Sequence, residues 1–123
     1  MEESHYKGKT GLRRVINAFG YSIDGLGSAI RNEPAFRQEL VLAAVLIPVA
    51  LFVDASGVER AVMIASVLIV LIVELLNSAV EAAVDRVSLD DHLLAKRAKD
   101  MGSAAVLLAL VNLVAVWVSI LFG

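Results

Sequence analysis

The chain has 123 residues, the length of a single domain covering residues 1–123, and 59% of them are hydrophobic. An ordinary soluble domain is roughly 45–50% apolar, and a small one buries only a modest share of its surface, so a water-soluble bundle is strongly disfavoured. The net charge of −2 gives no reason to expect nucleic acid as a partner, and the absence of cysteine excludes disulfides and thiolate-bound metals.

The first predicted element is an amphipathic helix at about residues 12–31. Apolar side chains recur at helical spacing from Leu12 through Phe19 to Ile30, opposite a polar face. Glycines between residues 20 and 27 weaken it as an isolated helix, by about 1 kcal/mol each relative to alanine. Burial of the apolar stripe in a lipid headgroup region offsets that cost, so we expect a surface helix.

Three apolar segments follow, at about residues 35–53, 61–85 and 103–122. Each is close to or longer than the ~20 residues that a helix needs to cross the hydrocarbon core. Pro34 suits the first turn of the first span, whereas Pro48 lies inside it and predicts a kink. The sequence therefore predicts an all-α membrane protein with one surface helix and three transmembrane helices.

The distribution of basic residues predicts the orientation of these spans. Most of them precede the first span or lie between the second and third: Lys7, Lys9, Arg13, Arg14, Arg31 and Arg37, then Arg86, Lys96, Arg97 and Lys99. The first connection contains only Arg60, and the C-terminal end contains none. Because cytoplasmic loops carry the excess of Lys and Arg, we expect a cytoplasmic N-terminus and a periplasmic C-terminus.

Five polar side chains share one face of the second span, at i, i+3, i+4, i+7 and i+11: Glu74, Asn77, Ser78, Glu81 and Asp85. Glu74 lies about 16 Å along the helix axis from Asp85, which places it within the hydrocarbon slab. An acid there costs roughly 2.5–3.5 kcal/mol on insertion scales, so such residues usually have a function. Asn77 and Ser78 have the alternative of serving as neutral polar contacts between helices, and for Ser78 that alternative is as good as a functional role.

Carboxylates at a cytoplasmic mouth predict either a cation site or a proton relay. Glu33 adds a third acid near the same interface, and Mg²⁺ is typically held by one or two carboxylates plus substrate phosphates. The nearby cations Arg14, Lys99 and Arg97 suit a polyphosphate. These are the components of phosphoryl transfer, with a lipid-buried carboxylate as general base, but a small proton or cation conduit and a purely structural subunit remain alternatives.

Several longer stretches of the chain resemble one family. The run from Glu74 to Arg86 is similar to the signature of the small prokaryotic integral-membrane diacylglycerol kinases, and residues 97–106 resemble its second conserved block. Residues 20–22 and 32–39 match its N-terminal elements in type, order and spacing. The resemblance covers nearly the whole chain.

This resemblance implies a homotrimeric bundle in the bacterial inner membrane, with active sites shared between subunits, that transfers the γ-phosphoryl group of MgATP to diacylglycerol and yields phosphatidic acid. It implies that Glu74 is the general base and that Glu33 and Glu81 hold Mg²⁺. It implies ATP contacts from Arg14, Tyr21, Glu33, Glu81, Asp90, Asp91, His92, Lys99 and Asp100. It implies lipid-substrate contacts from Arg14, Phe36, Gln38, Glu74, Asn77 and Ser103.

The nearest rival within this architecture is an undecaprenol kinase, which residues 97–106 match less well. Two positions depart from the family pattern. Ile23 stands where the family often has tryptophan, so the surface helix is expected to seat the lipid differently. Pro48 is also outside the pattern, whereas the acidic face of the second span follows it.

Overall fold

The computed structural model describes residues 7–87 and 93–123, with side chains from Thr10 onward. These residues form four helices and no strand: α1 (Lys7–Asn32), α2 (Pro34–Phe52), α3 (Gly57–Val87) and α4 (Leu93–Phe122). The predicted all-α architecture is therefore confirmed. Three of the helices, α2, α3 and α4, are long and apolar enough to cross a membrane, and the chain is a multi-pass membrane protein.

The chain divides after Glu33 into two compact units. The first contains α1, which begins at Lys7, whereas the sequence pattern predicted a start near residue 12. The prediction was late because the first turn of α1 is polar and lacks the apolar repeat that marks the rest of the helix. Large apolar side chains along this helix are exposed, among them Leu12, Ile16 and Phe19. This stripe has the form expected of a helix that lies on a lipid surface.

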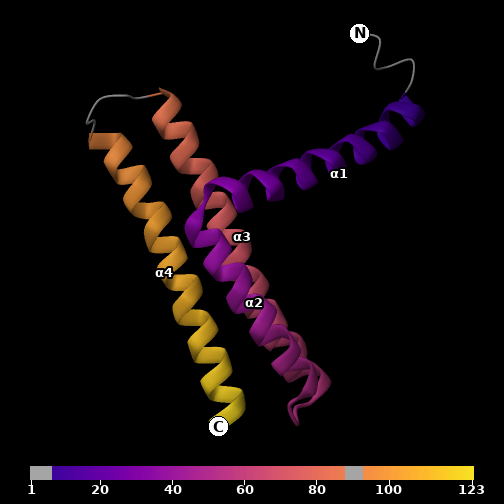
Figure 1. Cartoon of the computed structure of the whole chain (residues 1–123), viewed down its shortest axis with the longest axis vertical. Helices are drawn as coiled ribbons and strands as arrows, with labels where there is room; N and C mark the ends of the chain where they lie inside the picture. Colours follow the sequence, from indigo (N-terminus) through magenta and orange to yellow (C-terminus); the bar gives the residue numbers. More distant parts are fainter. Residues whose placement is uncertain (1–6, 88–92) are drawn as a thin grey trace. The chain divides into compact units, whose positions relative to one another are not determined.

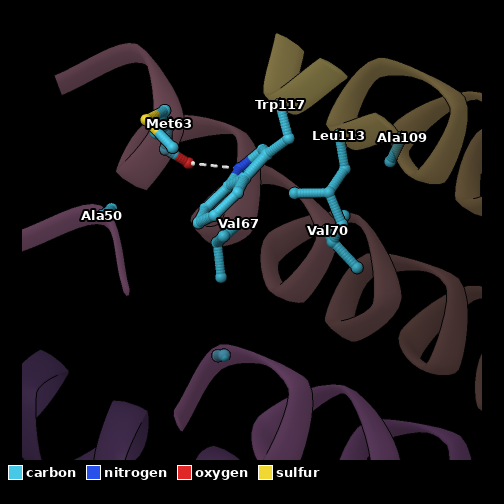
Figure 2. Close-up of a cluster of buried hydrophobic side chains, with 8 residues drawn as sticks. Ala50, Met63, Val67, Val70, Ala109, Leu113 and Trp117 are labelled. Atoms are coloured by element: carbon cyan, nitrogen blue, oxygen red, sulfur yellow. Dashed lines mark hydrogen bonds between the residues drawn. The ribbon is translucent and has the colours of Figure 1, made fainter. Parts of the chain in front are cut away.

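The second unit contains α2, α3 and α4, and both outer helices run alongside α3 (Figure 1). Its core gathers side chains from all three helices (Figure 2): Ala43, Ala50, Met63, Val67, Val70, Ala109, Leu113 and Trp117. The buried members from α2 are alanines, and small residues let helix backbones approach closely where lipid supplies no hydrophobic drive for association. The core thus fixes α3 between its two neighbours.

The connection between α2 and α3 satisfies its own polar groups. Ser56 and Glu59 form a capping box, in which the Ser56 N–H donates to Glu59 Oε1 at 2.9 Å and the Glu59 N–H donates to Ser56 Oγ at 3.1 Å. The Arg60 guanidinium donates to the carbonyls of Ala50 at 2.5 Å and Ala55 at 2.9 Å. The Ala50 carbonyl, one of those in the last turn of α2 that lack an intrahelical partner, is therefore paired with a cation.

A buried polar network joins α3 to α4 in the core. Trp117 Nε1 lies 3.1 Å from Ser66 Oγ and 3.3 Å from the Met63 carbonyl oxygen (Figure 2 shows the latter contact). Ser66 Oγ also donates to the Met63 carbonyl at 2.7 Å. The Trp117 and Ser66 side chains are both buried, so the indole N–H has its partners inside the protein.

We expect Trp117→Phe to lower the free energy of unfolding in mixed micelles by about 1–2 kcal/mol, because the indole hydrogen bonds are lost and the ring is smaller. Steric trapping or detergent titration measures this change. Ser119 is an exposed residue half a turn further along α4, so Ser119→Ala is the control and should leave stability unchanged. Equal stability of Trp117→Phe and the natural protein would contradict a stabilising role for the network.

Three of the sequence predictions concern the ends and the continuity of the helices. The polar stretch that follows residue 92 and the third span are one continuous helix, α4, which runs through Gly102 without a break. The predicted capping pair Ser88 and Asp91 lies outside the described residues. Helix α2 continues through Pro48 to Phe52.

Candidate active site

The polar face of α3 passes from a buried to an exposed environment. The Glu74 side chain is buried, with 6% of its surface exposed. Asn77, Ser78 and Glu81 are half-buried, and Asp85 is exposed. The face therefore runs from the bundle interior, where a charge is costly, to an end where ions and water have access.

Asn77 packs directly against the backbone of α4. A methyl group built at Gly102 would overlap Asn77 Oδ1, so only glycine accommodates this side chain where it stands. The same Oδ1 atom is buried and accepts no hydrogen bond from the described residues. A buried acceptor without a donor is uncommon in native structures, and it lies one helical turn from Glu74.

Two ion pairs lie at the polar end of α4. Lys99 Nζ is 2.5 Å from Asp85 Oδ1, and Lys96 Nζ is 2.7 Å from Asp100 Oδ2. The Glu81 carboxylate also acts electrostatically on Lys99. These pairs are exposed and contribute little to stability, so an incoming phosphate can take the lysine from its carboxylate.

Glu39 on α2 is a site residue that the sequence predictions did not include. Its carboxyl group lies within hydrogen-bonding reach of the Glu74 carboxyl, and its Oε2 atom is buried without a donor among the described residues. The sequence signal that could have revealed it is an acid at the start of an apolar run, immediately before Leu40. The structure thus places two acids from adjacent helices in contact.

The remaining predicted residues are distributed along the chain. Arg14 and Tyr21 are exposed on α1, and Glu33 is half-buried after its end. On the second unit Phe36 is buried, whereas Gln38 and Ser103 are exposed. The predicted ATP contacts Asp90, Asp91 and His92 lie outside the described residues.

The half-buried Glu81 carboxylate on α3 has the chemistry of a magnesium ligand. No group of three or more acidic or histidine side chains gathers within the described ranges, so a cage built entirely of protein ligands is not found there. Mg²⁺ instead usually takes one or two carboxylates and completes its shell with phosphate oxygens and water. The half-buried Glu81 carboxylate forms neither of the ion pairs found in the described part of α3 and α4.

Comparison with known proteins identifies the family. Residues 20–121 match the prokaryotic diacylglycerol kinase family. A diacylglycerol kinase of Pseudomonas aeruginosa is 58% identical over 123 residues, which is 100% of both chains. One of Haemophilus influenzae is 51% identical over 92% of this chain and 96% of its own, and one of Escherichia coli is 49% identical over 93% of each. The chain therefore belongs to the prokaryotic diacylglycerol kinase family.

Proposed function

We propose that the protein phosphorylates diacylglycerol with ATP, yielding phosphatidic acid at the cytoplasmic surface of the membrane. The observation that carries this proposal is the buried Glu74 carboxylate, at the point where the polar face of α3 enters the apolar bundle. A lipid alcohol reaches such a position from the bilayer, and a nucleotide reaches it from water. The names of the relatives support the same reaction.

In the proposed reaction Glu74 accepts the proton of the lipid hydroxyl as the bond from that oxygen to the γ-phosphorus forms. The bond between the γ-phosphorus and the β,γ-bridging oxygen breaks, and ADP leaves with the electron pair. Proton transfer by a positioned base contributes about 10²–10⁴-fold to such reactions. Bound Mg²⁺ supplies neutralisation of the phosphate charge.

We assign the other residues according to their chemistry. Glu33 and Glu81 hold Mg²⁺ with the ATP phosphates, and Asn77 and Ser103 line the site around the base and the lipid, together with Phe36 and Gln38. The nucleotide is contacted by Arg14, Tyr21, Lys99 and Asp100, with Asp90, Asp91 and His92 nearby. Lys99 leaves Asp85 for a phosphate in this assignment, which its exposed pairing permits.

The proposed setting is the bacterial inner membrane, with the N-terminus in the cytoplasm, the C-terminus in the periplasm and three subunits per assembly. The bias of Lys and Arg toward residues 7–37 and 86–99 supports the orientation. Apolar side chains exposed on α2, α3 and α4 offer surface for neighbouring subunits as well as lipid. Single cysteines introduced into this cysteine-free chain report the orientation by labelling from either side.

A lipid phosphorylation assay tests the proposed reaction. Purified protein in vesicles is given labelled ATP, titrated Mg²⁺ and either diacylglycerol or undecaprenol, and the labelled lipid product is separated. Label in phosphatidic acid is the expected result. Preferential label in undecaprenyl phosphate would assign the related kinase, and ion flux without ATP consumption would assign a conduit.

We expect Glu81→Gln and Glu33→Gln each to raise the Mg²⁺ concentration for half-maximal activity by about tenfold or more, because a carboxylate ligand becomes a neutral amide. Magnesium titrations at saturating ATP measure the shift. Asp54→Asn, an exposed acid in the connection after α2, is the matched control. An unchanged requirement in both glutamate variants would contradict the ligand assignment.

A further inference from the structure

An ion pair joins α3 to α4 close to the carboxylate that we assign to Mg²⁺. Lys99 Nζ on α4 lies 2.5 Å from Asp85 Oδ1 on α3, and the two side chains are 43% and 63% exposed. Asp85 follows Glu81 by four residues, so it stands one turn away on the same face of α3, about 6 Å further along the axis. The pair therefore holds the Lys99 ammonium next to the place where the phosphates are expected.

The orientation of Lys99 comes from α3 and not from its own helix. On α4 no acid stands three or four positions from Lys99, where helical neighbours face each other: these positions are Ala95, Lys96, Gly102 and Ser103. Lys96, in contrast, has Asp100 four residues on and pairs with it at 2.7 Å. One lysine is thus directed along α4, and the other is directed across to Asp85.

A phosphate competes well with Asp85 for this lysine. A terminal phosphate carries about two negative charges and three acceptor oxygens, whereas a carboxylate carries one charge and two oxygens. Both partners of the pair contact water, so breaking it costs little and leaves no buried charge on Asp85. Lys99 can pass from the carboxylate to a phosphate by rotation of its flexible four-carbon stem.

We propose that Asp85 is a positioning residue for Lys99, whose carboxylate takes the place of a phosphate before the nucleotide binds. Asp85 gives the lysine up when MgATP arrives and takes it back after the γ-phosphoryl group has been transferred. The proposal rests on the kinase function proposed above. Asp85 contacts neither Mg²⁺ nor lipid, and because it competes with the nucleotide, it lowers the affinity for ATP.

Nucleotide binding to Asp85→Asn tests this competition. The change removes the charge and keeps the shape, so Lys99 has no competing anion. We expect the Kd for the magnesium complex of β,γ-imido-ATP, measured by calorimetry on purified protein in vesicles, to fall about two- to fivefold, the worth of an exposed ion pair. The KM for MgATP should fall alike, with kcat unchanged. Asp54→Asn, the same change at an exposed acid after α2, is the control and should leave the Kd unchanged.

A double-mutant cycle with Lys99→Gln separates the ion pair from the general effect of charge. Removing any acid near the site favours an anionic ligand, but an effect exerted through Lys99 disappears when Lys99 is replaced. Lys99→Gln alone should raise the Kd for the same nucleotide complex. Adding Asp85→Asn should then change nothing further.

Chemical labelling of lysines follows the ion pair without any nucleotide. An amine-reactive reagent, with the modified positions identified by mass spectrometry, should label Lys99 faster in Asp85→Asn than in the natural protein, because its amine is no longer held by a carboxylate. Lys96 is the internal reference, because its pair with Asp100 is unaltered.

Three results would overturn the proposal: a Kd that does not fall in Asp85→Asn, a fall that persists in the Lys99→Gln background, or labelling of Lys99 that is the same with and without Asp85. A Kd that rises in Asp85→Asn would place Asp85 on the metal or the nucleotide itself. Any of these in a protein that still phosphorylates lipid leaves the kinase function intact. Faster labelling of Lys99 in Asp85→Asn, together with no phosphoryl transfer by the natural protein, would instead sink the kinase function and leave the ion pair.

Discussion

Glu74→Gln is expected to bind MgATP and fold normally while losing about 10²–10⁴-fold in kcat, the contribution of a positioned general base. The amide has nearly the same shape as the carboxyl group, so it fits the buried position on α3, but it cannot accept the hydroxyl proton. Labelled-ATP transfer to diacylglycerol measures kcat, and nucleotide binding is measured separately by calorimetry.

The control for this variant is Glu59→Gln, which makes the same change on the same helix. Glu59 belongs to the capping box at the start of α3, and glutamine serves in that motif as well. Its activity and stability should match those of the natural protein. A Glu74→Gln variant with near-natural turnover would remove Glu74 from the base role, and a variant without nucleotide binding would point to a wider disruption.

Gly102→Ala is expected to lower kcat by about ten- to hundredfold, since small displacements of a substrate-positioning group have effects of this size. The added methyl group overlaps Asn77 Oδ1, the end of a rotatable side chain, so the amide turns away from its place beside Glu74. Stability should change little, because alanine in a helix interior gains about 1 kcal/mol over glycine and offsets the crowding.

A double-mutant cycle with Asn77→Ala isolates this effect. Once the amide is gone, adding Gly102→Ala has nothing to displace, so the double variant should be as active as Asn77→Ala alone. Gly57→Ala is the matched control, because the space around Gly57 is open. Additive losses in the cycle would show that Gly102 acts by another route.

The arrangement of spans could be predicted from sequence because lipid constrains a chain more strongly than water does. Only helices of sufficient length satisfy their backbone within the hydrocarbon core, and apolar length alone therefore located α2, α3 and α4. The face shared by Glu74 and Glu81 followed from helical spacing within one element. Both inferences use information that lies inside a single segment.

The contacts that the sequence did not reveal join different helices, and they depend on how those helices are aligned along their axes. Glu39 stands at the start of α2, and its contact with Glu74 arises only when α2 and α3 align in one register. The pairing of Lys99 with Asp85 and the overlap of Gly102 with Asn77 likewise depend on how α4 meets α3. Periodicity along one helix carries no information about how far a neighbouring helix is shifted along the common axis.

The connection between α2 and α3 has a consequence for how the protein enters its membrane. In the proposed orientation this hairpin tip must be translocated through lipid, and it carries Arg60, the one basic residue between positions 38 and 85. The Arg60 guanidinium donates hydrogen bonds to the carbonyls of Ala50 and Ala55, and these bonds replace part of its hydration shell during translocation. The two helices are thereby suited to insert together as a preassembled hairpin, ahead of α4 during biogenesis.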